Sequence, residues 1–147
     1  MRVRWLIILL ILTIGSTLVM ESVANQRKSL KAILDEKKDN SRVVLVYVRD
    51  DAQHYLIEQQ DSFRQVEDEF RERDMEIIVL VASTLMEPDR QFLMQSDFKL
   101  IPAEDFMGWL IGKDGTVKHR FAQPIDPKEL FSLIDTMPMR KQEMKKQ

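Results

Sequence analysis

Six consecutive apolar residues, Val43 to Val48, constrain the fold of this chain more than any other feature of its sequence. A strand with one face in water alternates polar and apolar residues, whereas a strand covered on both faces is apolar at every position. The run leaves no polar face. It therefore predicts a central strand from Arg42 to Val48, in a parallel sheet with helices on both faces.

The next segments predict a strand-helix-strand crossover. Residues 25–36 form a short first helix in this interpretation. After the central strand, Asp50 or Asp51 is expected to cap a long amphipathic helix that runs to about Arg73. Its buried face consists of apolar residues at helical spacing: Leu56, Phe63, Val66 and Phe70. Met75 to Val81 is expected to be a second buried strand, reached by a right-handed connection.

The second half of the chain predicts a β-hairpin. Phe106 to Ile111 is expected to be a third strand, in which Gly108 indicates a bulge or a close backbone approach. Asp114-Gly115 is a strong hairpin signal, and residues 116–121 alternate as a half-exposed edge strand does. His119 on this strand is interpreted as a partly covered residue rather than a catalyst.

Two further helices flank the hairpin in this prediction. Before it, Pro88 suits the first turn of a short helix. After it, Asp126-Pro127 combines an aspartate cap with a proline at the first helical position. This closing helix is expected to end at Pro138. The polar tail from Arg140 to Gln147 is expected to be loosely docked, and frayed after about residue 144.

Composition excludes several function classes. The 147-residue chain contains no cysteine, which excludes disulfides, thiolate metal sites and thiol-disulfide oxidoreductase activity. Charges of both signs are interspersed, and the basic stripe with interleaved aromatic residues that is typical of nucleic-acid binders is missing. We therefore expect no nucleic-acid partner.

The first 24 residues have the pattern of a secretory signal peptide. Arg2 and Arg4 precede an apolar run that begins at Trp5, and Ser22-Val23-Ala24 offers small residues before Asn25. Cleavage there would leave 25–147 as a single exported domain, periplasmic or secreted. Losing Arg2, Arg4 and Glu21 would change the net charge from −2 to −3.

The alternative for this leader is a membrane anchor formed by residues 5–20. As a helix that segment spans about 24 Å, short of the ~30 Å apolar core of a bilayer. Cleavage is therefore favoured, and any membrane contact is expected only through an uncleaved leader.

Two C-terminal segments carry a resemblance to a known family. Leu110 to Gly115 reads Leu-Ile-Gly-Lys-Asp-Gly, and Leu130 to Met144 follows it with Met-Pro-Met-Arg at its centre. Together they resemble the signature of domain of unknown function 4174, over about Leu30 to Met144. Members of that family are thioredoxin-like and mostly bacterial and exported, and similar modules recur in vertebrate sushi-repeat proteins of the extracellular matrix.

The resemblance implies an α/β, thioredoxin-like fold, but no established activity. It implies a central mixed sheet of about four strands, with a βαβ crossover, a β-hairpin, a closing helix and helices on both faces. The sequence departs from redox members of the superfamily, because Arg49 to His54 replaces their Cys-x-x-Cys motif. Their cis-proline directly precedes the third strand, whereas three residues separate Pro102 from Phe106.

Polar residues at the start of the long helix are candidates for a ligand or partner site: Arg49, Asp50, Asp51 and His54. Glu58 lies four residues after His54, and carboxylates with an imidazole can bind a divalent metal or act as acid and base. The favoured interpretation is that the acids cap the helix and His54 is solvated. No catalytic residue, metal site or cofactor is assigned.

The expected binding crevice lies at the carboxyl ends of the parallel strands, where Arg49 to His54 and residues 82–86 would meet. Acids at the helix start favour a cation or a basic partner segment over a phosphate. Arg140, in the C-terminal Met-Pro-Met-Arg segment, marks a competing surface. The leading hypothesis is a non-enzymatic interaction module of the cell envelope with an unidentified protein partner. The alternative is a metal-dependent or acid-base enzyme centred on His54.

Overall fold

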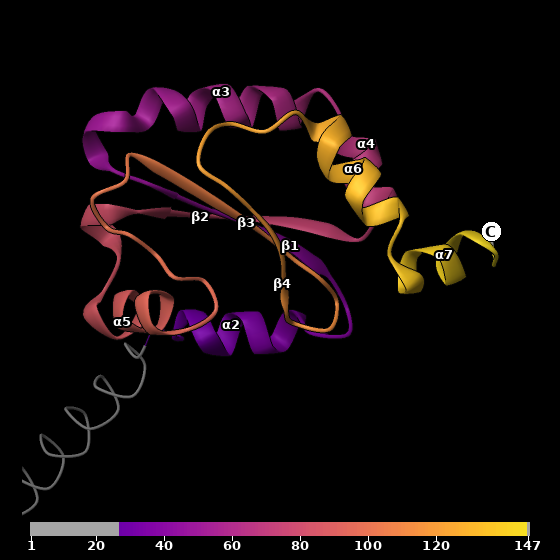
Figure 1. The fold of residues 1–147 in the computed structure, drawn as a ribbon, viewed down its shortest axis with the longest axis horizontal. Helices are drawn as coiled ribbons and strands as arrows, with labels where there is room; N and C mark the ends of the chain where they lie inside the picture. The colour runs from indigo at the N-terminus through magenta and orange to yellow at the C-terminus, as the bar shows by residue number, and fades with distance from the viewer. Residues whose placement is uncertain (1–26, 147) are drawn as a thin grey trace, which may run out of the picture.

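A four-stranded mixed sheet forms the centre of the molecule in this computed structural model, which describes residues 27–146 (Figure 1). The strand order is β2-β1-β3-β4. β1 (Arg42–Val48) pairs in parallel with β2 (Met75–Val81) and antiparallel with β3 (Phe106–Ile111). β4 (Val117–Phe121) is antiparallel to β3 at the far edge.

Helices cover both faces of the sheet (Figure 1). One face packs against α3 (Gln53–Arg64), α4 (Glu67–Glu72) and α6 (Pro127–Asp135), and the other against α2 (Leu30–Lys37) and α5 (Glu87–Gln95). Three short elements complete the chain: the 3-10 turns η1 (Asp50–Ala52) and η2 (Ala82–Thr84), and the last helix α7 (Pro138–Met144). This architecture confirms the expected fold class.

β1 is the central strand that its sequence predicts. All seven of its residues are buried, and its side chains alternate between two apolar cores. Val44, Val46 and Val48 face α3 and α6, while Val43, Leu45 and Tyr47 face α2 and α5. Each fully buried aliphatic side chain contributes about 1.5–3 kcal/mol. A polar residue at any position from Val43 to Val48 would face one of these cores, which explains why this run has no polar face.

The prediction of one long helix to Arg73 is wrong. α3 ends at Arg64 and α4 begins at Glu67, and Val66 between them departs from helical geometry with φ −129° and ψ 35°. The break directs the Phe70 ring onto Phe63, with 4.8 Å between ring centroids. Packing of Phe70 into the core therefore takes precedence over continuing the helix.

The hairpin forms at Asp114-Gly115, as expected. Gly115 has φ +79°, and the Asp114 carboxylate accepts a hydrogen bond from the Thr116 amide at 3.0 Å. The close approach at Gly108 involves a side chain rather than a backbone, since an added Cβ would lie 2.0 Å from the Phe121 ring. The irregularity in register lies between Leu110 and Ile111 instead.

The expected start of the closing helix is confirmed. Asp126 accepts a hydrogen bond from the Lys128 amide at 2.9 Å, with Pro127 in the first turn. The predicted signal peptide, 1–24, and the alternative anchor, 5–20, lie outside the described residues. None of the helices within 27–146 combines the length and apolar character needed to cross a membrane.

Candidate functional site

The carboxyl ends of β1 and β2 bring two short turns together. η1 follows β1 and η2 follows β2, and the Asp50 carboxylate links them. It accepts hydrogen bonds from the Ser83 amide, at 3.1 Å, and from the Ser83 hydroxyl. The two chain segments expected to form the crevice therefore lie side by side.

The prediction that Asp50 or Asp51 caps the long helix is wrong. The N-cap of α3 is Ala52, and among the described residues no side chain caps this helix. η1 holds both acids before the helix, where Asp50 bonds to Ser83 and Asp51 pairs with Arg49. Any preference of this edge for cations must therefore come from the surrounding acidic side chains. It cannot come from an aspartate that caps the amides at the start of α3.

Arg49 fixes the loop that precedes β3. Its Nη1 donates to the Ala103 carbonyl and to the Asp105 carboxylate, both at 3.3 Å, and its Nη2 donates to Asp51 at 3.1 Å. The Arg49 amide also donates to the Asp105 carbonyl at 3.0 Å. One side chain thus holds two loops in a fixed relation at the mouth of the sheet.

A hollow of about 440 Å³ lies beside these contacts. It is lined by the residue after β1 and by residues of α3, the loop before β3, the start of β3 and the segment after β4: Arg49, Tyr55, Ala103, Glu104, Asp105, Phe106, Ala122 and Gln123. Of these, only Arg49 is a candidate from the sequence. Asp105 could have been found from its place directly before a predicted strand, whereas the residues after β4 carry no such signal.

Within residues 27–146, His54 does not form part of an acid-base or metal cluster. Its exposed ring lies 4.0 Å from that of Tyr55, measured between centroids. Among the described residues, no hydrogen bond or ion pair joins His54 to a carboxylate. Within 27–146, no group of three or more histidine, aspartate and glutamate side chains is placed to hold a metal ion.

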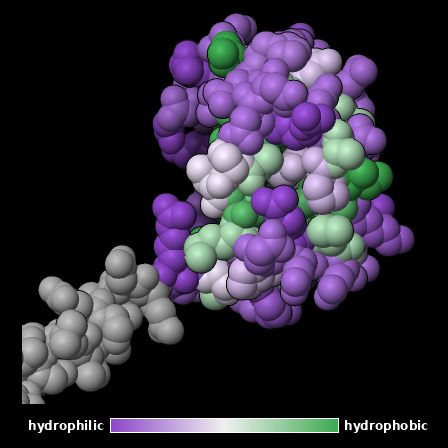
Figure 2. Space-filling model, turned by 90° about the vertical axis from the view of Figure 1, so that its left-hand side faces the viewer, coloured by the Kyte–Doolittle hydropathy of each residue, from purple (hydrophilic) through white to green (hydrophobic). Residues whose placement is uncertain are grey.

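Carboxylates dominate the exposed charge at this edge. Asp51, Glu104 and Asp105 are all exposed, and Arg49 is the basic side chain between them. Figure 2 looks onto this end of the molecule, where apolar surface crosses the middle of the face between two hydrophilic regions. Ile101, in the loop before β3, is among the exposed large apolar residues. The edge therefore presents acidic groups next to apolar surface.

Arg140 lies at the opposite end of the molecule from this edge, on α7 (Figure 1). Its side chain is only 1% exposed. It donates to the Glu72 carbonyl at 3.1 Å, to the Glu72 carboxylate at 2.5 Å and to Asp135 at 3.3 Å. The structure therefore separates Arg140 from the other candidate residues and gives it partners within the chain.

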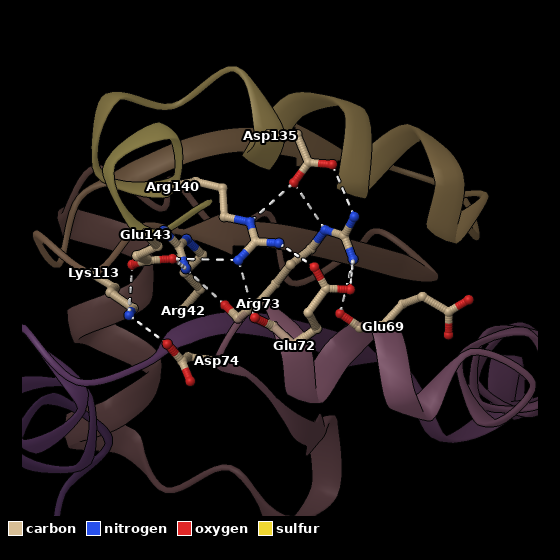
Figure 3. A network of polar contacts seen from close by, with 9 residues as sticks. All are labelled: Arg42, Glu69, Glu72, Arg73, Asp74, Lys113, Asp135, Arg140 and Glu143. Carbon is tan, nitrogen blue, oxygen red and sulfur yellow. Dashed lines mark hydrogen bonds and ion pairs between the residues drawn. The ribbon is translucent and has the colours of Figure 1, made fainter. Parts of the chain in front are cut away.

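A second buried arginine, Arg42, shares this network (Figure 3). Arg42 donates to both carboxylate oxygens of Glu143 at 3.2 Å and to the Arg73 carbonyl at 2.7 Å. Lys113 pairs with the same Glu143 at 2.8 Å and with Asp74 at 2.6 Å. The prediction of a loosely docked tail from Arg140 is wrong. Arg140 and Glu143 of α7 form hydrogen bonds and ion pairs with Glu72 and Arg42 of the folded domain.

The network also lowers the pKa of two of its carboxyl groups. The pKa of Asp135 is lowered, chiefly by hydrogen bonds from Arg73 and Arg140. Burial alone would raise the pKa of Glu143, but hydrogen bonds from Lys113 and Arg42 outweigh it and hold this pKa below its ordinary value. Both carboxyl groups are therefore stabilised in their charged form by the folded structure.

A family profile described as a domain of unknown function, DUF4174, matches residues 33–143. The chain belongs to this family. No curated protein shows a significant match to this DUF4174 chain. The expected likeness to sushi-repeat modules stays a prediction.

Solved structures show the fold of this DUF4174 chain. Reduced 2-Cys peroxiredoxin from Plasmodium vivax is 14% identical with a TM-score of 0.55, over 74% of this chain and 72% of that one. Plasmodium yoelii Prx1a, modified at the N-terminus, is 16% identical with a TM-score of 0.52, over 74% and 80%. The fold is thioredoxin-like, as these likenesses show, and at such identities they indicate nothing further.

Proposed function

We propose that this DUF4174 chain is a non-enzymatic, exported binding module that recognises a basic segment of a protein partner at the carboxyl edge of β1 and β2. One observation carries the proposal. Arg49 holds two loops in a fixed rim around a hollow, and the exposed charges of that rim are mainly carboxylates. A preformed acidic rim with apolar surface nearby suits a basic partner segment, because complementary charge sets specificity.

Binding rather than catalysis is supported by the same edge. Arg49 to His54 replace the dithiol of redox relatives, and the chain has no cysteine to supply a thiolate. Fold alone does not assign a function to such a site.

Selection of random displayed peptides against the purified protein tests the site. We expect the selected peptides to be rich in lysine and arginine. Their affinity should fall about tenfold, or ~1.4 kcal/mol, in the double variant Asp51→Asn/Asp105→Asn. It should also weaken with added salt, because exposed charges are screened.

The matched control is Asp61→Asn/Asp68→Asn, which removes the same number of exposed acids from α3 and α4. This variant should bind the selected peptides as the unmodified protein does. Peptides without a basic bias, or equal losses in both double variants, would refute the acidic rim as the recognition surface.

Export is the second part of the proposal and is supported by the leader sequence alone. N-terminal sequencing of the protein from the cell envelope should begin at Asn25. A membrane-bound product that retains Met1 would instead support the anchor formed by residues 5–20.

A further inference from the structure

The outer edge of β2 is open. β2 lies at one end of the sheet, and its backbone pairs only with β1 among the described strands. The Asp74 carbonyl points toward β1, since it accepts a hydrogen bond from the Arg42 amide at 2.8 Å. Backbone groups alternate in direction along a strand, so the amides and carbonyls of Ile77 and Val79 point outward. No described segment donates to these carbonyls or accepts from these amides.

β2 lacks the features that usually protect an edge strand. Such strands carry charged side chains, prolines or bulges that prevent pairing with another chain. At the other edge, β4 has Lys118 and Arg120, next to a register shift in its pairing with β3. β2 has one charge, Glu76, and continues Ile-Ile-Val-Leu-Val in unbroken register with β1. Glu76 is itself held by Lys37 at 2.5 Å, at the start of the strand.

Grooves run along both faces of this open strand. On the α3 and α4 side, a hollow of about 650 Å³ includes the apolar residues Phe63, Phe70, Met75, Ile77 and Val79. On the other side, a hollow of about 560 Å³ includes Leu30, Ile33, Ile78, Leu80 and Met86. A strand added at this edge would place alternate side chains in the two grooves. The segment that fits must therefore be apolar at successive positions.

We propose that this edge pairs with β2 of a second copy of the chain, antiparallel and related by a two-fold axis at Ile78. β2 itself has the required pattern, with five successive apolar residues from Ile77 to Val81. Among the described strands, the other two of this kind, β1 and β3, are already paired on both sides. A two-fold contact uses the same patch on both copies and closes after one pair.

The register follows from the outward backbone groups. Ile77 of one copy forms the hydrogen-bonded pair with Val79 of the other, and the two Ile78 residues face each other as a non-hydrogen-bonded pair. The charged rim of the α3 and α4 groove suits self-association, because it carries both signs: Arg64, Glu67 and Arg71. The carboxyl edge proposed as the binding site is a separate surface and stays free in both copies.

Sedimentation equilibrium of the full chain tests this interface. We expect a dimer, and Ile77→Lys should shift it to monomer because a charge would enter the pairing edge at a residue that is 41% exposed. Ile57→Lys is the matched control, since Ile57 is 59% exposed on α3 and lines neither groove. Circular dichroism melting should show both variants folded. A monomeric unmodified chain would overturn the proposal.

A single introduced cysteine gives a second measurement. The chain has no other thiol, so Ile78→Cys should form a disulfide-linked dimer on mild oxidation. Facing residues of a non-hydrogen-bonded pair lie about 4.5 Å apart between Cα atoms, within the range of a disulfide. Ile57→Cys should stay reduced under the same conditions. Equal cross-linking of the Ile78→Cys and Ile57→Cys variants would refute pairing at β2. A dimer that persists in the Ile77→Lys variant would also refute it and would indicate association through another segment, such as residues 1–26.

Discussion

Gln59 is a buried polar side chain, and two of its hydrogen bonds join distant parts of the chain. Its amide nitrogen donates to the Ile125 carbonyl at 3.0 Å, and its amide oxygen accepts from the Ile125 amide at 2.8 Å. The pair ties α3 to the segment that leads into α6. A buried backbone group without a partner costs about 1–3 kcal/mol, so both groups of Ile125 depend on this residue.

We expect Gln59→Ala to lower the free energy of unfolding by about 2–4 kcal/mol, because it leaves a donor and an acceptor unpaired. Urea unfolding measures the change. Its neighbour Gln60 is exposed, and Gln60→Ala should stay within about 0.5 kcal/mol of the unmodified protein. Equal midpoints for the two variants would show that water replaces the Gln59 contacts.

Gly108 shows how two strands constrain each other at the scale of elements. The Phe121 ring of β4 lies across this glycine of β3, at a distance that leaves no room for a Cβ. Gly108→Ala should destabilise the protein by about 1–3 kcal/mol through overpacking. Phe121→Leu shortens the opposing side chain, so the double variant should recover part of the loss. Additive losses in thermal unfolding would contradict the direct contact.

The anchoring of α7 is a second case at this scale. Arg140→Ala removes one member of a buried charge network and leaves the charge of Glu72 and Asp135 partly uncompensated. We expect a loss of about 1–3 kcal/mol in unfolding free energy, because hydrogen bonds to charged groups are lost while both acids stay partly in water. The adjacent Lys141 is exposed, and Lys141→Ala should change stability by less than about 0.5 kcal/mol. A similar small effect for Arg140→Ala would place α7 outside the folded core.

Sequence patterns correctly predicted the elements that are determined by residues close together in the sequence. The apolar run of β1, the Asp114-Gly115 turn and the Asp126 cap each lie within one short segment. The break before Glu67 and the docking of α7 could not be predicted in this way. Both depend on contacts between distant segments: Phe70 packs in the core, and Arg42 pairs with Glu143, 101 residues away.

In the candidate site, too, the sequence predicted what depends on chain order but not what depends on contacts between distant residues. The predicted topology placed Arg49 and Asp50 at the carboxyl edge of the sheet, because both residues directly follow the first strand of the β-α-β crossover. It could not show that Asp50 would bond to Ser83 rather than cap α3, since that choice depends on the turn η1. Arg140 was a candidate because its motif is unusual, and the structure gives that motif a role in holding the chain end.

Stability of the whole molecule should depend on pH through the charge network. The pKa values of Asp135 and Glu143 are lowered in the folded state from 3.8 and 4.5, so below about pH 5 the unfolded chain binds more protons. The free energy of unfolding should therefore fall as the pH falls through these values. Urea titrations between about pH 3 and 6 measure the slope. Glu143→Gln should reduce this slope, because it removes one of the two shifted groups.

The pairing of Arg42 with Glu143 also affects when the chain can fold during its synthesis. Arg42 opens the central strand, but its carboxylate partner Glu143 is synthesised 101 residues later. A buried guanidinium without a counter-charge opposes folding. A growing chain is therefore unable to complete this part of its fold until Glu143 has been synthesised and has left the ribosome. For a protein proposed to cross a membrane unfolded, this delay keeps the chain competent for translocation, and nascent chains that end before Glu143 should remain protease-sensitive.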